Sequence, residues 1–131
     1  MKPLRDTNPK TILLVDDEEG IRFFLEKLLI SEGYTIINAC NGKKAVEIYK
    51  EESTSIDLIL MDLNMPVMDG IEAHNELTQF DPEVVIMFMS AYEQEWVNEV
   101  QNIHFIRKPM NPAELFNKID ECLNLNAVET G

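Results

Sequence analysis

Three aspartates stand where a fold could bring their carboxylates together. Asp16 and Asp17 directly follow the apolar run 11–15, and Asp62 directly follows the apolar run 58–61. If both runs are neighbouring parallel strands, the three carboxylates meet at one sheet edge and repel one another until a hard cation binds. The pattern therefore predicts Mg²⁺ as the bound ion and phosphoryl transfer as the chemistry.

Five short apolar runs predict the strands that would position these groups. Each is rich in Ile, Leu, Val, Met or Phe, is too short for a helix, and is bounded by charged or turn residues. Such runs are typical of strands that are buried on both faces. The predicted strands are 11–15, 35–39, 58–61, 84–89 and 103–106.

Helical patterns separate these strands. Gly33 suits a left-handed cap after the first helix, and Asn41 can cap the second. Asn111 followed by Pro112 is typical of an N-cap and the first position of a helix. The helical patterns cover 21–29, 41–49, 70–80, 93–100 and 111–123.

This alternation predicts an α/β fold in which a doubly wound parallel sheet of five strands lies between two layers of helices. Parallel strands need helical crossovers, and these crossovers cover both faces of the sheet. Function in such folds lies at the carboxyl ends of the strands. Ser90 follows the fourth predicted strand and Lys108 the fifth, so both are expected to join the three aspartates.

The composition indicates one soluble domain whose partners are proteins. The chain of 131 residues carries 24 Asp and Glu against 11 Lys and Arg, a formal net charge of −13. This charge disfavours direct binding to nucleic acid or to anionic membranes. No apolar run resembles a membrane span or a secretion signal, which predicts a cytoplasmic location. Cys40 and Cys122 form no metal-binding or disulfide pattern and are predicted to be reduced, small core residues.

Four segments in this order resemble a response-regulator receiver domain of two-component signalling. The resemblance rests on Asp16-Asp17, Asp62-Leu63-Asn64-Met65-Pro66-Val67-Met68-Asp69-Gly70, Ser90-Ala91 and Lys108-Pro109. It implies a flavodoxin-like strand order 2-1-3-4-5, with an N-terminal arm over 1–9, the receiver domain over 10–125 and a tail over 126–131. Only the segment 91–107 separates the Ser90 and Lys108 motifs, which is shorter than usual in the family, so a shortened fourth helix is expected.

The resemblance assigns the chemistry to particular residues. Asp62 is implied to be the phosphoacceptor, with Lys108 supplying a mobile positive charge to the phosphoryl oxygens. Mg²⁺, for which Mn²⁺ can substitute, is implied to bind Asp17, Asp62 and the backbone carbonyl of Asn64. Asp16 is implied to hold a metal-bound water.

Residues near the phosphoacceptor are implied to control the consequences of phosphorylation. The hydroxyl of Ser90 would bond to a phosphoryl oxygen and act as a switch together with Phe105. Phe105 can equally be an ordinary core residue. Asn64, Ala91 and Tyr92 are implied to control access to the acyl phosphate and therefore its lifetime.

The segment 16–22 is similar to the single-domain regulators of sporulation phosphorelays. In those proteins, apolar residues beside the acidic pair dock on a four-helix phosphotransfer bundle. The corresponding residues are Ile21 and Phe24, and they are expected to act with Pro109, whose preceding peptide bond is cis in the family, and with Met110. For Ile21 and Phe24 the alternative is a place in the core.

The resulting prediction is a stand-alone receiver that accepts a phosphoryl group from a sensor histidine kinase or a histidine phosphotransfer protein. It would signal by phosphorylation-dependent binding to a downstream protein, with self-phosphorylation and autodephosphorylation chemistry but without being an enzyme. One alternative is a Mg²⁺-dependent phosphohydrolase with an aspartate nucleophile, although such enzymes usually carry a second aspartate where this chain has Asn64. Another is a phosphorylation-independent binding module of the same fold. A flavin module is disfavoured because the acidic segment 16–19 would repel phosphate.

Overall fold

The computed structural model describes residues 9–63, 65, 67–91 and 104–130, and strands and helices alternate along most of this length. Tyr92 and the fourth helix predicted over 93–100 lie outside the described residues. The elements are β1 (Thr11–Val15), α1 (Glu19–Ser31), β2 (Thr35–Ala39), α2 (Gly42–Glu52), β3 (Leu58–Asp62), α3 (Gly70–Phe80), β4 (Ile86–Ser90), β5 (His104–Arg107) and α5 (Pro112–Thr130).

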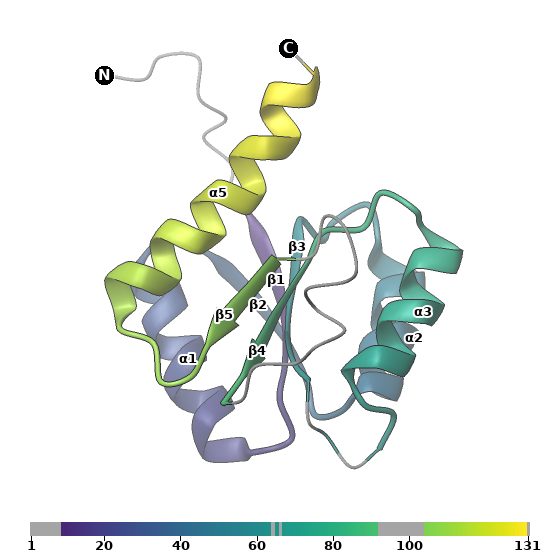
Figure 1. Cartoon of the computed structure of the whole chain (residues 1–131), viewed down its shortest axis with the longest axis horizontal. Helices are drawn as coiled ribbons and strands as arrows, with labels where there is room; N and C mark the ends of the chain where they lie inside the picture. Colours follow the sequence, from purple (N-terminus) through teal and green to yellow (C-terminus); the bar gives the residue numbers. More distant parts are fainter. Residues whose placement is uncertain (1–8, 64, 66, 92–103, 131) are drawn as a thin grey trace.

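The five strands form one sheet in the order β2-β1-β3-β4-β5, and every neighbouring pair is parallel. Helices α1 and α5 cover one face of the sheet, and α2 and α3 cover the other (Figure 1). The predicted three-layer fold and strand order are therefore confirmed.

Alternate residues of the central strands face opposite helical layers. Leu13 and Val15 of β1 pack in the core formed with α2 and α3, whereas Ile12 and Leu14 pack in the core formed with α1 and α5. All four side chains are fully buried. Two buried faces explain why this run is apolar at consecutive positions.

Helices α2 and α5 begin at the capping residues that the sequence indicates. The side chains of Asn41 and Asn111 accept hydrogen bonds from the backbone N–H groups of Lys44 and Glu114, at 2.8 and 2.7 Å. Gly33 follows α1 with a φ of +100°, a conformation that a residue without a Cβ adopts readily. These local signals place the end of α1 and the starts of α2 and α5.

Several sequence-based expectations differ from the structure. Strand β4 spans Ile86–Ser90 rather than 84–89, because Val84 is held in a turn by a 3.1 Å hydrogen bond from its N–H to the carbonyl of Asp81. The last helix, α5, continues to Thr130, beyond the predicted pattern 111–123, since no Pro or Gly interrupts it before Gly131. Cys40 is exposed rather than in the core, because it follows the edge strand β2.

Cys122 is buried, as predicted, and both cysteines are free. Burial raises the pKa of the Cys122 thiol to about 12, with a further contribution from the negative charge of Glu121. The Cys122 thiol is therefore protonated near neutral pH. Within the described ranges, each helix is too short or too polar to span a membrane.

Candidate phosphorylation site

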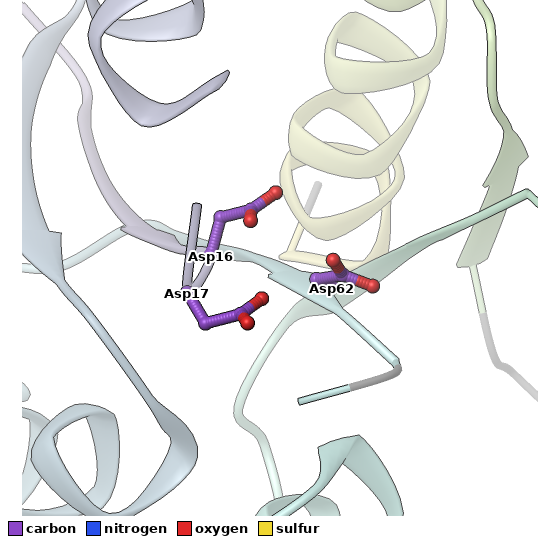
Figure 2. A group of neighbouring side chains, drawn as sticks. All are labelled: Asp16, Asp17 and Asp62. Atoms are coloured by element: carbon purple, nitrogen blue, oxygen red, sulfur yellow. The ribbon is translucent and has the colours of Figure 1, made fainter. Parts of the chain in front are cut away.

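The three aspartates meet at the carboxyl edge of the sheet. Asp16 and Asp17 directly follow β1, and Asp62 is the last residue of the neighbouring strand β3. One carboxylate oxygen from each residue lies within 4.8 Å of those of the other two. Figure 2 shows the side chains of Asp16 and Asp17 extending from the end of β1 toward the side of Asp62. The convergence predicted from the two apolar runs is confirmed.

Asp16 is held by several backbone contacts and is fully buried. Its N–H donates to the carbonyl of Ala39 at 3.2 Å, and its Oδ1 accepts a 2.9 Å hydrogen bond from the N–H of Glu18. Asp62 is nearly as buried, whereas Asp17 is exposed. The cluster therefore has two buried acids and one that faces solvent.

Lys108 lies between the two buried acids. Its Nζ is 3.3 Å from Oδ2 of Asp16 and 3.3 Å from Oδ2 of Asp62. Burial alone lowers the pKa of the Lys108 ammonium, but the charges of Asp62 and Asp16 and the hydrogen bonds to them outweigh that effect and raise the pKa. Lys108 therefore stays charged, and its peptide bond to Pro109 is cis.

Ser90 ends β4 beside Asp62. The strands β3 and β4 pair Asp62 with Met89, and the carbonyl of Ser90 accepts a 2.8 Å hydrogen bond from the N–H of Lys108. Ser90 is fully buried. Phe105, on β5, is partly buried and packs against the core shared with α2 and α3. The structure therefore places Ser90 at the cluster and Phe105 on the adjoining strand.

A largely apolar hollow of about 370 Å³ adjoins this site. It is lined by Ile21, Phe24, Leu25, Ala91, Lys108, Pro109 and Met110. The four residues expected to dock a partner thus line one surface. Phe24 is 63% exposed, whereas Ile21 is half-buried and packs against the core, so Ile21 also contributes to packing.

Two features of the site are absent from the sequence-based assignment. The guanidinium of Arg22 donates a 2.7 Å hydrogen bond from Nη1 to the backbone carbonyl of Asp16 and so braces the acidic loop. Its position one helical turn after that loop is the only signal in the sequence. Leu25, a buried residue of α1, also lines the hollow. Asn64 and Tyr92 lie outside the described residues.

The donor set fits a small divalent cation. Three carboxylates converge, and Lys108 supplies one positive charge to two of them, which leaves the group with net negative charge. Hard oxygen donors in this arrangement suit Mg²⁺, which binds one or two carboxylates and keeps several waters. The exposed side of Asp17 leaves room for those waters.

Comparison with known proteins identifies the family. Residues 12–120 match the model of the response regulator receiver domain. The chain is 37% identical to the chemotaxis protein CheY of Bacillus subtilis (strain 168), over 86% of this chain and 97% of that protein. It is 34% identical to sporulation initiation phosphotransferase F of the same organism, over 88% of this chain and 95% of that protein.

A solved structure extends the comparison. The crystal structure of the CheX-CheY-BeF3-Mg+2 complex from Borrelia burgdorferi matches with a TM-score of 0.79 and 32% identity, over 85% of this chain and 87% of that one. This chain belongs to the response regulator receiver domain family of two-component phosphorelay signalling. Receiver domains interact with histidine kinases and phosphotransfer proteins, and the family binds Mg²⁺ at its acidic pocket.

Proposed function

We propose that Asp62 accepts a phosphoryl group from the phosphohistidine of a sensor kinase or a histidine phosphotransfer protein in a Mg²⁺-dependent reaction. The observation that carries this proposal is the setting of Asp62, whose carboxylate is buried, pairs with Lys108 at 3.3 Å and lies beside Asp16 and Asp17. Family membership supports the phosphoacceptor role. The cytoplasm remains the predicted location.

In the proposed step, a carboxylate oxygen of Asp62 bonds to phosphorus as the P–N bond to the donor histidine breaks. The electron pair of that bond stays on the imidazole, which leaves as a neutral ring because its other nitrogen carries a proton. The ammonium of Lys108 stabilises charge on the phosphoryl oxygens. Asp17 and Asp62 would hold Mg²⁺, which supplies further positive charge to those oxygens, and Mn²⁺ is expected to substitute.

The response to phosphorylation is proposed to start at Ser90. Its hydroxyl lies at the buried end of β4, beside the strand that carries Asp62. A bond from this hydroxyl to a phosphoryl oxygen would move the chain after β4, and the ring of Phe105 on β5 would follow. The altered surface would then bind a downstream protein, which remains to be identified.

Partner docking is proposed for the hollow between α1 and the turn after β5. Phe24 presents an exposed aromatic ring there, next to Pro109 and Met110. Lys108 lines the same hollow and contacts Asp62, so a helix seated in the hollow would bring its phosphohistidine close to the acceptor. The hollow supports docking through apolar contact rather than charge.

The decisive experiment is incubation with acetyl phosphate and Mg²⁺ followed by intact-mass measurement. The wild-type protein should gain one phosphoryl group that hydroxylamine removes, and Asp62→Ala should gain none. Asp120→Ala, which removes an exposed acid on α5, should be labelled like the wild type. Sustained release of inorganic phosphate over many turnovers, without a phosphoprotein, would instead indicate a phosphohydrolase.

Labelling of Asp62→Ala at the wild-type level would contradict the assignment of the acceptor. A wild-type protein that binds Mg²⁺ yet is labelled by neither acetyl phosphate nor a phosphohistidine donor would indicate a phosphorylation-independent binding module. Loss of the incorporated group over time in the purified protein would demonstrate the proposed autodephosphorylation.

A further inference from the structure

The first residue of α2 touches the chain that leaves the phosphoacceptor strand. Gly42 is buried, and its N–H donates a 3.3 Å hydrogen bond to the carbonyl of Val67. A Cβ at this position would overlap the carbonyl oxygen of Met68 and would lie 3.2 Å from Cβ of Ala73. A glycine is therefore required for the backbone of α2 to approach this loop.

Leu63 and Gly70, after β3 and at the start of α3, are held by backbone hydrogen bonds. The N–H of Leu63 donates to the carbonyl of Met89 at 3.0 Å, and the N–H of Gly70 donates to the carbonyl of Leu63 at 3.0 Å. Met68 has a φ of +51°, which few residues other than glycine adopt. Gly70, two residues after Met68, is thus bonded to Leu63, the residue that follows Asp62.

The chain just before Gly42 contacts the other part of the acidic cluster, the pair Asp16 and Asp17. Gly42 lies three residues after Ala39, whose carbonyl accepts the 3.2 Å hydrogen bond from the N–H of Asp16. Ala39 thus touches the chain that carries Asp16 and Asp17, and Gly42 touches the chain that leaves Asp62. The segment 39–42 links the two parts of the cluster independently of the β1–β3 ladder.

We infer that Gly42 is a positioning residue for the cation site, acting through the backbone rather than through any contact with the ion. Its missing side chain sets how closely the loop after Asp62 approaches the segment after β2, and therefore how the carboxylates of Asp17 and Asp62 face each other. The inference rests on the proposed function, because it assumes that these two acids hold Mg²⁺.

The test is Gly42→Ala, with Mg²⁺ affinity measured by isothermal titration calorimetry. Displacing the loop should weaken Mg²⁺ binding about tenfold, the usual effect of disturbing groups that orient metal ligands. The matched control is Gly20→Ala, where an added Cβ meets nothing within 4 Å. That variant changes the same residue type in α1, close to the acidic loop, and should bind Mg²⁺ like the wild type.

A second control separates positioning from lost stability. Asn41→Ala removes the cap that binds the N–H of Lys44 but adds no atom toward Met68. This variant should have a lower melting temperature and unchanged Mg²⁺ affinity. Gly42→Ala should instead bind Mg²⁺ more weakly, because its Cβ displaces the loop. Its melting temperature should fall less than that of Asn41→Ala, because alanine is a better helix former than glycine.

If Gly42→Ala does not fold, Met68→Gly provides the test. It removes the side chain at the residue that Gly42 contacts and should weaken Mg²⁺ binding severalfold. Because Met68 packs against the core formed with α2 and α3, the melting temperature should also fall, so the affinity is measured on the folded variant. Wild-type affinity in a folded Gly42→Ala, or in Met68→Gly where that variant replaces it, would overturn the inference. A wild-type protein that binds no Mg²⁺ would instead contradict the proposed function.

Discussion

The acidic cluster has two flanks that are built in opposite ways. The open flank consists of α1 and the turn after β5, where Phe24 and Met110 surround an apolar hollow beside Lys108. The closed flank consists of α2, α3 and residues 67–70, where the backbone of Gly42 lies against that of Val67 and Met68. Large side chains line the first flank, whereas the missing side chain of Gly42 permits the close backbone approach in the second.

This difference separates two tasks of a phosphoacceptor site. An exposed aromatic ring beside the acceptor can be buried by a partner, which gains free energy from the apolar area that leaves water. Backbone segments in close contact have little freedom to rearrange and can keep carboxylates at fixed separations. We therefore expect substitutions on the open flank to change partner transfer, and substitutions on the closed flank to change metal binding or stability.

The largest expected effect concerns Asp17, the exposed acid of the cluster. Asp17→Asn removes an anionic ligand, so Mg²⁺ affinity should fall by at least about 100-fold, more than disturbing an orienting group would cost. Thermal melts with and without Mg²⁺ provide the check, because an ion that binds only the folded state raises the melting temperature. The wild-type protein should gain stability from Mg²⁺, and Asp17→Asn should lose that gain.

Without Mg²⁺, Asp17→Asn should melt at or above the wild-type temperature, because it relieves repulsion among the three carboxylates. A wild-type melt that does not respond to millimolar Mg²⁺, together with a lower melting temperature for Asp17→Asn, would contradict the cation site.

The next effect tests the open flank. Phe24→Ala should slow transfer from a phosphorylated histidine phosphotransfer protein about tenfold, because it removes an aromatic anchor from the hollow. Labelling by acetyl phosphate should be unchanged, since this small donor needs no docking. Autoradiography of transfer to each variant, with a phosphotransfer protein that labels the wild type, measures the difference.

Phe23 is the matched control for Phe24. Its side chain is 58% exposed, close to the 63% of Phe24, but it lies under the ammonium of Lys27 at 4.8 Å instead of lining the hollow. Phe23→Ala should leave transfer within about twofold of the wild type, as expected for a residue outside the contact. Equal slowing in both variants would rule out the hollow as the specific docking surface.

A smaller effect is expected at the far end of the closed flank. The hydroxyl of Tyr49 on α2 donates a 2.6 Å hydrogen bond to Oδ2 of Asp81 after α3. Tyr49→Phe should lower the free energy of unfolding by about 1 to 2 kcal/mol, as expected for a lost bond to a charged acceptor. Denaturant titration measures the loss, and phosphorylation by acetyl phosphate should be unaffected.

The pH dependence of the same bond has a definite sign. Burial, followed by the hydrogen bond and charge of Asp81, raises the pKa of Tyr49 above its ordinary value of 10.0. The unfolded chain therefore loses this proton at lower pH than the folded protein, so stability should fall as the pH rises above 10.0. If the stability of Tyr49→Phe falls equally over this pH range, Tyr49 is not the source of the pH dependence.

The smallest effect concerns His74 on α3 and His104 on β5. Burial lowers the pKa of both imidazoles from 6.5, and for His104 the charge of Glu121 opposes this shift while Lys118 adds to it. The unfolded chain then binds protons that the folded protein does not. Stability from these residues is thus present above pH 6.5 and is lost as the pH falls toward the folded pKa values.

Urea titrations from about pH 7 to about pH 5 can measure this loss. The double variant His74→Gln, His104→Gln should lose less stability over that range than the wild type. Parallel curves would show that other groups, such as carboxylates, account for the whole acid sensitivity.

Much of the framework follows from local patterns in the sequence. The run 11–15 is apolar at every buried position because β1 is covered on both faces, and Asp16 and Asp17 end it abruptly. Asn41, Asn111 and Gly33 indicate helix ends through contacts within a few residues. The strand order implied by the resemblance to receiver domains then places Asp62 beside Asp16, because neighbouring parallel strands end at the same edge.

Contacts between distant segments were decided only by the tertiary structure. The exposure of Phe24 and the half-burial of Ile21 depend on how α1 rotates against the sheet, although both residues belong to one apolar stripe. The need for glycine at Gly42 arises from Met68, which is remote in sequence and leaves no local pattern at α2. Periodicity and caps report on neighbours along the chain, whereas hollows and close backbone contacts depend on which surfaces packing brings together.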